Sequence, residues 1–330
     1  MLVTILVAFF STPLVIRLAK KIGLIDNPET HKHPKVIHTY PTPRGGGAAI
    51  FLAILSGSIL FLPLDKFLAS ILLGAFLITA LGILDDKFDL NPYLRLVAQF
   101  VIAAIPVFCG VGISFTTRPF GGIVNLPQPL PYIFSVFWLV FLMNILNMGA
   151  KGIDGQLPGV ASLAAFTIAL LSLKYSADIT QWPTIVLALI TAGSFLGFLP
   201  WNTYPQKIMP SYSGSTLAGY MLAVLSILST AKVGTLIVVL GIPLVDTGYT
   251  IVRRIFSGKS PVWGDRGHLH HKLYDAGLSK GKIALFYWLG TALLGILALK
   301  LNAEFKLYTI IFIILVIGGL LLWLTYRPKN

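Results

Sequence analysis

The chain has 330 residues, of which 56% are hydrophobic and 11% are charged, and its formal net charge is +13. A soluble domain carries about 25% charged residues, so this composition excludes an ordinary soluble enzyme. Apolar runs of about 20 residues recur along the sequence and predict a polytopic α-helical membrane protein, because a transmembrane β-barrel shows short alternating segments instead. Excess Lys and Arg are typical of cytoplasmic loops, so nucleic-acid binding is not expected. The single cysteine, Cys109, excludes an internal disulfide.

Eleven membrane spans are predicted, with ten as the alternative count, in one domain over residues 1–330. The first span carries its charges after the apolar run, so it is not a cleavable signal, and the N-terminus is predicted outside. This orientation places about 19 of the 25 Lys and Arg residues in the cytoplasm, together with the C-terminus. The predicted spans are 1–19, 46–63, 67–84, 93–110, 131–147, 157–173, 182–200, 214–230, 233–252, 283–300 and 306–325.

The third span ends in a cluster of acids, in the stretch GILDDKFDL, which contains Asp85, Asp86 and Asp89. Asp85 and Asp89 share a face if the helix continues past the span. Three carboxylates at a membrane boundary repel one another, so we expect a cation beside them, from Lys87, Arg95 or a divalent ion. Adjacent carboxylates suit Mg²⁺, which prefers oxygen ligands. The alternative is a solvated helix end with ordinary surface acids.

The connections after the fourth and fifth spans differ in character. Residues 111–130 are rich in glycine and proline and predict an external hairpin. The stretch NILNMGAKGIDGQLPG, in contrast, places Asn144 and Asn147 on one helix face, followed by Lys151 and Asp154 in a glycine-rich turn. Glycines let backbone N–H groups approach a phosphate, and the lysine adds positive charge. A plain turn between two helices is the alternative, since it needs only the glycines.

Two later stretches carry further polar residues. In the connection 197–219, the sequence SGST precedes an apolar helix and predicts an N-cap that could also bind an anion. Asp246 lies about 10 Å of helical rise before Arg253, a depth at which an acid is functional or paired within the bundle. The sequence HLHH lies in the following loop, which is rich in Arg and Lys. It suits either a soft metal or an anion, and the lack of an obvious fourth ligand favours the anion.

The motifs DDKFD, NILN…IDG, GFLPWN…KI…SGS, PLVDT…RR and GHLHH occur in this order over about residues 15–280. Together they resemble the polyprenyl-phosphate N-acetylhexosamine-1-phosphate transferases, and HLHH is similar to the branch that uses UDP-N-acetylglucosamine. The resemblance implies that a polyprenyl (undecaprenyl) phosphate attacks the β-phosphate of the UDP-sugar and that UMP leaves. It implies an enzyme of the plasma membrane whose active site faces the cytoplasm. It implies Mg²⁺ as the cofactor, for which Mn²⁺ could substitute. The product would be a lipid intermediate in the synthesis of lipopolysaccharide or teichoic acid. A homodimer is left open.

The resemblance also implies roles by position. Asp85 and Asp86 lie beside the attacking phosphate and are the predicted catalytic residues. A phosphate monoester has a second pKa near 6, so this nucleophile is largely ionised at pH 7 without a base. The predicted metal ligands are Asp85, Asp86, Asp89, Asn147 and Asp154. The predicted substrate contacts are Arg44, Lys87, Asn144, Lys151, Lys207, Arg266, His268, His270 and His271.

Two positions depart from the family pattern. Where the family reads KIFMGDSGS and uses the Asp as a principal Mg²⁺ ligand, this chain reads KIMPSYSGS and has Tyr212. A neutral phenol is a poor Mg²⁺ ligand. Where many members read DGxDG, only Asp154 remains and Lys151 is nearby. The favoured prediction is an active transferase in which Asp85, Asp86 and Asp89 bind more of the metal. The alternatives are a non-catalytic relative that binds lipid phosphate or nucleotide, and a secondary transporter.

Overall fold

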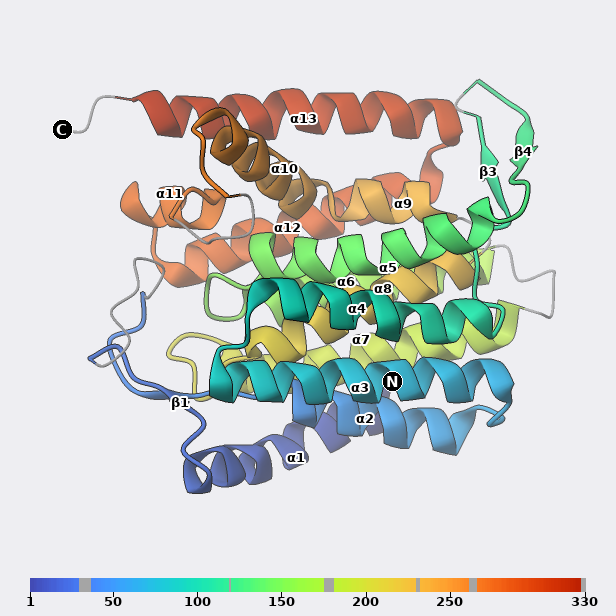
Figure 1. Cartoon of the computed structure of the whole chain (residues 1–330). Coiled ribbons are helices and arrows are strands. Elements are labelled where there is room, and N and C mark those ends of the chain that lie inside the picture. The colour runs from blue at the N-terminus through green and yellow to red at the C-terminus, as the bar shows by residue number, and fades with distance from the viewer. Residues whose placement is uncertain (30–36, 119, 175–180, 230–231, 261–265, 328–330) are drawn as a thin grey trace.

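The computed structural model describes residues 1–29, 37–118, 120–174, 181–229, 232–260 and 266–327. Most helices run side by side along one direction, and two short hairpins lie at opposite ends of them (Figure 1). The elements are α1 (Leu2–Lys21), β1 (Ile25–Asp26), β2 (Thr42–Pro43), α2 (Gly47–Phe61), α3 (Lys66–Phe88), α4 (Pro92–Phe108), β3 (Phe115–Thr117), β4 (Ile123–Asn125), α5 (Leu130–Gly149), α6 (Gln156–Lys174), α7 (Trp182–Asn202), α8 (Ser211–Leu228), α9 (Lys232–Val239), α10 (Gly241–Phe256), α11 (Leu269–Asp275), α12 (Lys280–Lys300) and α13 (Ala303–Tyr326).

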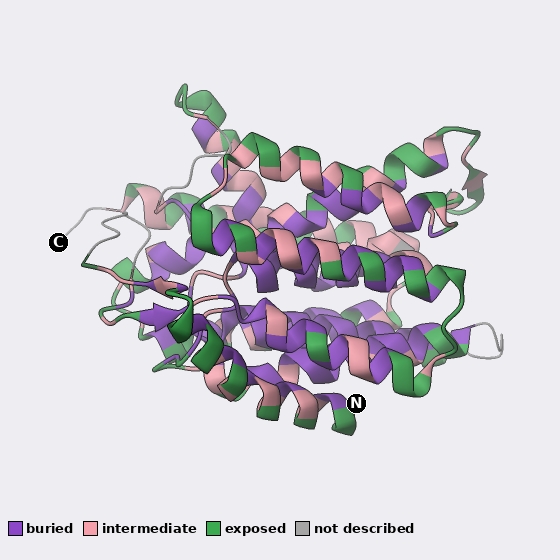
Figure 2. Cartoon of the chain, turned by 60° about the horizontal axis from the view of Figure 1, so that its bottom comes forward, coloured by how far each residue is buried: buried purple, intermediate pink, exposed green. Residues whose placement is uncertain are grey.

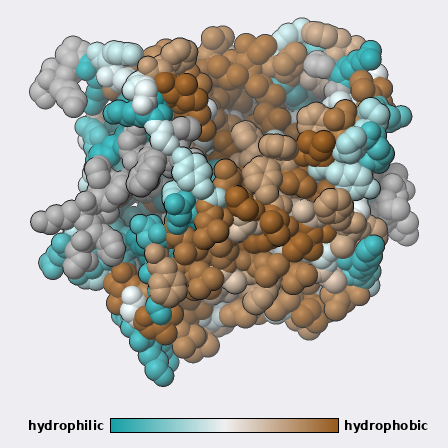
Figure 3. Space-filling view, in the orientation of Figure 1, coloured by the Kyte–Doolittle hydropathy of each residue, from teal (hydrophilic) through white to brown (hydrophobic). Residues whose placement is uncertain are grey.

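The helices have the length and hydropathy of a multi-pass membrane protein. Within the described ranges, eight helices are long and apolar enough to cross a membrane, or nine if the bent pair α9 and α10 is one span. The helices α2 and α4 are apolar but shorter, so the predicted count of eleven is not established. Figure 3 shows a broad hydrophobic band over the middle of the molecule, with hydrophilic residues at both ends of the helices. This band is what the hydrocarbon core of a bilayer requires.

The predicted ninth span, 233–252, is not one continuous helix. It divides into α9 and α10, which meet at an angle of 82°. Gly241 and Pro243 lie in the first turn of α10. Proline fits there because a first-turn N–H has no partner within the helix, so the local sequence favours a new helix start over a continuous span. In contrast, the hairpin predicted within 111–130 is confirmed, because β3 and β4 pair antiparallel.

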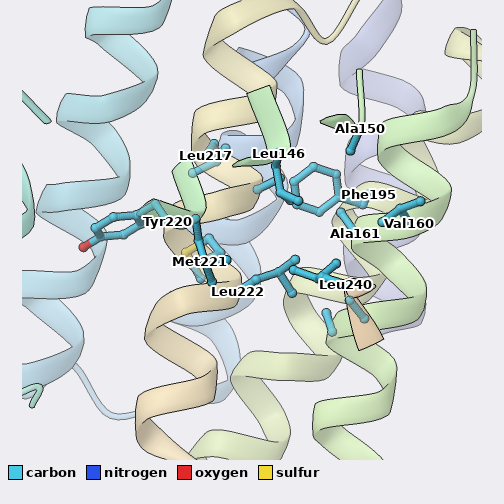
Figure 4. Close-up of a cluster of buried hydrophobic side chains, with 14 of the residues drawn as sticks. Leu146, Ala150, Val160, Ala161, Phe195, Leu217, Tyr220, Met221, Leu222 and Leu240 are labelled. Atoms are coloured by element: carbon cyan, nitrogen blue, oxygen red, sulfur yellow. The ribbon is translucent and has the colours of Figure 1, made fainter. Parts of the chain in front are cut away.

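The core is centred on α8, most of whose residues are buried between α3, α5 and neighbouring helices. Figure 2 shows the same division across the molecule, with buried residues inside and exposed residues along the outward faces. The helix α13 lies at the edge and is mostly exposed, as expected of a helix facing lipid. Figure 4 shows part of the core, where α8 meets α5, α6 and α7 through Leu146, Val160, Ala161, Phe195, Leu217, Met221 and Leu222, while Tyr220 points toward α3.

A glycine sets the distance between α3 and α8 near one end of the molecule. A Cβ atom on Gly82 would lie 2.7 Å from the backbone nitrogen of Ser213, which is too close for any larger residue. Small residues at such contacts let two membrane helices approach closely. Asp86 is one helical turn further along α3 and therefore points in the same direction. The close approach at Gly82 thus brings the acids of α3 to the start of α8.

Candidate active site

The polar motifs found in the sequence meet at one end of the helices, the end that carries β1 and α11 in Figure 1. The C-terminal end of α3 contacts the N-terminal end of α8 there, and the turn between α5 and α6 contacts α11. The β3–β4 hairpin lies at the opposite end. The fold therefore brings together segments that are far apart in the sequence, from Asp85 to His271.

Asp86, in α3, accepts the hydrogen bonds of the first turn of α8. Its carboxylate accepts hydrogen bonds from the backbone N–H of Tyr212 at 2.9 Å and of Ser213 at 3.4 Å, and from the Ser213 hydroxyl at 3.0 Å. The prediction that SGST caps this helix is wrong. The helix begins at Ser211, its N-cap is Pro210, and the SGST residues lie inside it. A carboxylate from a neighbouring helix satisfies the first-turn N–H groups instead.

Asp85 and Asp89 have different surroundings from Asp86 and from each other. One terminal nitrogen of Arg95, in α4, donates to both carboxylate oxygens of Asp85 at 3.0 and 2.8 Å. The expected local cation for the acid cluster is therefore Arg95. The expectation that Asp89 shares a face with Asp85 is wrong, because α3 ends at Phe88. Asp89 is exposed and adopts a left-handed conformation with φ 48°.

Tyr212 lies buried between these groups. Its hydroxyl accepts from the side-chain amide of Gln99 at 2.8 Å, and the Gln99 carbonyl oxygen accepts from Asn144 at 2.7 Å. The guanidinium of Arg95 lies 4.9 Å and the amine of Lys151 lies 5.7 Å from the centre of the Tyr212 ring. Both distances suit cation–π contacts. The residue that replaces the usual metal ligand is thus held by hydrogen bonds and flanked by two cations.

The histidine loop is anchored by Asp246. One oxygen of this fully buried carboxylate accepts from the Leu269 backbone N–H at 2.7 Å, and the other lies 3.1 Å from Nδ1 of His268. The rings of His268 and His270 stack, with their centres 5.5 Å apart. An acid at this depth was predicted to be functional or paired within the bundle, and Asp246 is paired with His268 and the Leu269 N–H. Asp246 orients the loop that the sequence assigned to substrate.

Next to that loop, the buried polar atoms without a hydrogen-bond partner among the described residues include Nδ1 of His270 and one carboxylate oxygen of Asp154. The other Asp154 oxygen lies 3.5 Å from the amine of Lys280. Gly152 lies directly against the His270 ring, and a methyl group there would collide with it. Burial, together with His271, His268 and Arg266, holds the pKa of His270 well below its usual value, so its ring is neutral. We call Gly152, Asp154 and His270 the loop cluster.

The remaining predicted contacts divide into residues at this site and residues on its surface. Arg44 donates to the backbone carbonyl of Asp86 at 3.3 Å and to Asp26 at 2.7 Å. His271 is buried beside His270, with ring centres 4.4 Å apart. The exposed or half-exposed residues pair locally, since Lys87 lies over Phe88, Lys207 over Trp201, and Arg266 donates to Asp275.

Sequence reasoning did not include Gln99, Asp26 and Lys280 among the site residues. Gln99 had a recognisable signal, because an amide inside the apolar run of α4 needs a partner in the bundle. Lys280 and Asp26 look like ordinary loop charges in the sequence. Only the tertiary structure brings Lys280 to Asp154 and Asp26 to Arg44.

The described residues fit Mg²⁺ poorly. Among them, no three Asp, Glu, His or Cys side chains form a group that could hold a metal ion. Arg95 engages both oxygens of Asp85, the start of α8 engages Asp86, and the Asn147 side-chain oxygen accepts from Ser215 at 2.9 Å. Magnesium prefers available carboxylate oxygens. Among the buried predicted ligands, Asp154 keeps one such oxygen, which by itself does not make a metal site. The Mg²⁺ site remains a prediction, and no reaction step is assigned to a metal below.

Comparison with known proteins identifies the family. Residues 68–230 match glycosyl transferase family 4. The chain is 32% identical to a "Probable undecaprenyl-phosphate N-acetylglucosaminyl 1-phosphate transferase" of Bacillus subtilis, over 96% of this chain and 87% of the relative. It is 29% identical to a "Decaprenyl-phosphate N-acetylglucosaminephosphotransferase" of Mycobacterium leprae, over 88% and 80%. It is 30% identical to an "Undecaprenyl-phosphate alpha-N-acetylglucosaminyl 1-phosphate transferase" of Thermotoga maritima, over 85% and 82%. The chain belongs to glycosyl transferase family 4.

Proposed function

We propose that this chain transfers N-acetylglucosamine 1-phosphate from UDP-N-acetylglucosamine to a polyprenyl phosphate. An oxygen of the lipid phosphate attacks the β-phosphorus of the UDP-sugar and forms a new P–O bond. The bond between that phosphorus and the bridging oxygen breaks, and UMP leaves with the electron pair. The products are UMP and a lipid diphosphate sugar, and the total charge is unchanged. Polyprenyl substrates of this kind are named for the relatives above.

The loop cluster is the observation that carries the proposal. A buried carboxylate oxygen and a buried imidazole nitrogen without partners are costly, and each such group in a native protein calls for an explanation, such as a catalytic role or a bound water or ion. Contact with the substrate is the explanation proposed for these two atoms. Asp154 and His270 offer one acceptor and one group that can donate or accept, at the end of the molecule where the apolar surface stops. A site at that boundary suits one substrate dissolved in lipid and another dissolved in water.

The side chains divide the work between orientation and charge. Asp246 fixes the histidine loop, and neutral His270 can hydrogen-bond the diphosphate-sugar without repelling cations that neutralise the phosphates. Lys151, half-buried beside the acids, supplies positive charge. The lipid phosphate is largely dianionic at pH 7, so no base is required. The engagement of Asp85 by Arg95 agrees with that view, because one guanidinium nitrogen donates to both oxygens of this carboxylate.

The finer topology belongs to the same proposal. We assign eleven spans by counting α2, α4 and the α9–α10 pair, with the N-terminus outside and the active site on the cytoplasmic face of the plasma membrane. Concentration of Lys and Arg in the loops at this end supports the orientation. The lipid product would serve the synthesis of an envelope polysaccharide, with undecaprenyl phosphate as the carrier. Homodimerisation remains a prediction.

The test is a UMP-release assay with the purified full-length chain, undecaprenyl phosphate and a panel of UDP-sugars, run with and without Mg²⁺. We expect UMP release that depends on the lipid and is fastest with UDP-N-acetylglucosamine. Each UMP should be matched by one lipid diphosphate sugar, detected by mass spectrometry. No UMP release with any sugar, in either buffer, would reject the proposal.

A second candidate is a non-catalytic relative that binds the same substrates, and Tyr212 is the observation that favours it. The phenol stands where the family has a metal-binding acid, and Gln99 holds its hydroxyl. If the parent chain is silent and Tyr212→Asp gains turnover, this candidate is preferred. Family membership speaks against the third alternative, a secondary transporter.

A further inference from the structure

Lys151 occupies an unusual position in the site. It lies in the turn after α5, is half-buried, and places its amine 5.7 Å from the centre of the Tyr212 ring. It also attracts the carboxylate of Asp86 electrostatically. Tyr212 and Asp86 both stand at positions where family resemblance places acids that serve the metal. In this chain a lysine amine therefore faces the residues that would otherwise face a cation.

The neighbouring groups leave little room for a divalent ion to be held by the protein. Arg95 neutralises Asp85, the N–H groups of Tyr212 and Ser213 use the oxygens of Asp86, and the Tyr212 hydroxyl is bonded to Gln99. Two cations, Arg95 and Lys151, flank the same ring. A divalent ion placed among them would be repelled by both and would have to displace hydrogen bonds that cap α8.

We propose that the ammonium group of Lys151 neutralises the substrate phosphates in place of a divalent cation held by the acids, so that substrate binding and turnover do not require Mg²⁺. This inference rests on the proposed transfer for the identity of its ligand. Lys or Arg can neutralise the negative charge of a phosphoryl group, as Mg²⁺ does in other phosphoryl transfers. The ring of Tyr212 keeps the ammonium in place through its electron-rich face and cannot itself chelate a metal.

The first test measures binding and does not depend on turnover. UDP-N-acetylglucosamine is titrated into the purified full-length chain by calorimetry, in excess EDTA and in Mg²⁺. We expect dissociation constants that agree within about twofold. Lys151→Met should weaken binding about tenfold in EDTA, the loss of one charge-assisted hydrogen bond, whereas Lys151→Arg should stay within about threefold. Lys282→Met, an exposed lysine at the start of α12, is the matched control and should bind as the parent does.

Two results would overturn the inference. One is nucleotide binding by the parent that is lost in EDTA and restored by Mg²⁺. The other is parent-like binding by Lys151→Met, with an unchanged melting temperature showing that the variant is folded. A variant that melts early is replaced by Lys151→Gln, which keeps the polar chain but not the charge, and the same tenfold loss is expected.

The second test reverses the substitution. In the double variant Tyr212→Asp with Lys151→Gly, nucleotide binding should become dependent on Mg²⁺ by about tenfold or more. A double variant whose nucleotide binding does not depend on Mg²⁺ contradicts the assignment.

UMP release in EDTA separates the two proposals. Release that needs Mg²⁺ defeats this inference and leaves the transfer intact. Binding as predicted, without UMP release in either buffer, supports Lys151 and defeats the transfer.

Discussion

Two groups of buried acids at the same end of the molecule contrast with each other. The acid pair, Asp85 and Asp86, is fully engaged by a guanidinium and by the first N–H groups of α8. The loop cluster, in contrast, retains a carboxylate oxygen of Asp154 and Nδ1 of His270 without partners among the described residues. Hydrogen-bonded groups stabilise the structure, whereas an unsatisfied buried group calls for an explanation. Under the proposed function, the acid pair builds the site and the loop cluster contacts the substrate.

The largest effect is expected from removing the carboxylate that joins α3 to α8. Asp86→Ala leaves the Tyr212 and Ser213 N–H groups without an acceptor, which should lower the free energy of unfolding by about 1–3 kcal/mol. UMP release should fall more than about 100-fold, because Tyr212 and Lys151 are displaced. Asp86→Asn still caps the helix, so its melting temperature should recover while turnover remains low.

Asp65→Asn is the matched control for that prediction. Asp65 also caps a helix, accepting from the Leu68 N–H at 2.8 Å, but at the other end of α3. Its turnover and melting temperature should match those of the parent. Parent-like turnover in Asp86→Asn would remove the acid pair from the site.

The next effect concerns the buried pair of Asp154 and Lys280. Lys280→Met leaves Asp154 without its cation and should lower the free energy of unfolding by about 3 kcal/mol, the low end for a broken buried pair, because the two atoms are 3.5 Å apart. Melting temperature in detergent measures this. Asp154→Asn added to Lys280→Met should restore part of the loss. Lys282→Met, exposed two residues further along, should change nothing, and equal losses in both lysine variants would refute the pairing.

A smaller effect separates the two substrates. His270→Ala should raise the KM for UDP-N-acetylglucosamine about tenfold, or about 1.4 kcal/mol, with little change in the KM for the lipid, because the ring belongs to the loop cluster. Tyr274→Ala, at an exposed residue four positions further along the same short helix, serves as control. An unchanged nucleotide KM would place the substrate away from this cluster.

The smallest effect is a pH dependence of stability. His270 is neutral in the folded chain because its pKa is well below the usual value, whereas an unfolded histidine titrates near about 6.5. Below that pH the unfolded chain binds a proton that the folded chain does not, so stability falls as pH falls. Between pH 7.5 and 6.0 His270 should contribute about 0.8 kcal/mol of this loss. The melting temperature of His270→Ala should therefore fall less over this range, and identical slopes would contradict the neutral ring.

The sequence predicted the helices well and their ends less well. Apolar runs locate the eight described helices that are long and apolar enough to cross a membrane, because hydrophobic length is a local property. The break at Gly241 and the end of α3 before Asp89 depend on turn conformations that neighbouring segments select. The cap of α8 was missed for the same reason, since Asp86 lies 126 residues before the N–H that it accepts.

The candidate site was predictable as a set of motifs but not as a set of bonds. Acids, amides and histidines in a fixed order indicated the chemistry. Which cation meets which acid was not encoded locally, so Arg95 was only one of several candidates and Lys280 was not considered. The replacement of an acid by Tyr212 was visible, but its pairing with Gln99 and its contact with Lys151 required the packed structure.

The central claim is that this end of the molecule moves a sugar phosphate from a nucleotide to a lipid. The most direct measurement follows UMP and lipid diphosphate sugar together, from UDP-N-acetylglucosamine and undecaprenyl phosphate, for the parent chain and for Asp86→Asn. The account predicts equal amounts of both products from the parent and more than about 100-fold less from the variant. No lipid-dependent UMP from the parent, or equal rates from both proteins, would contradict it.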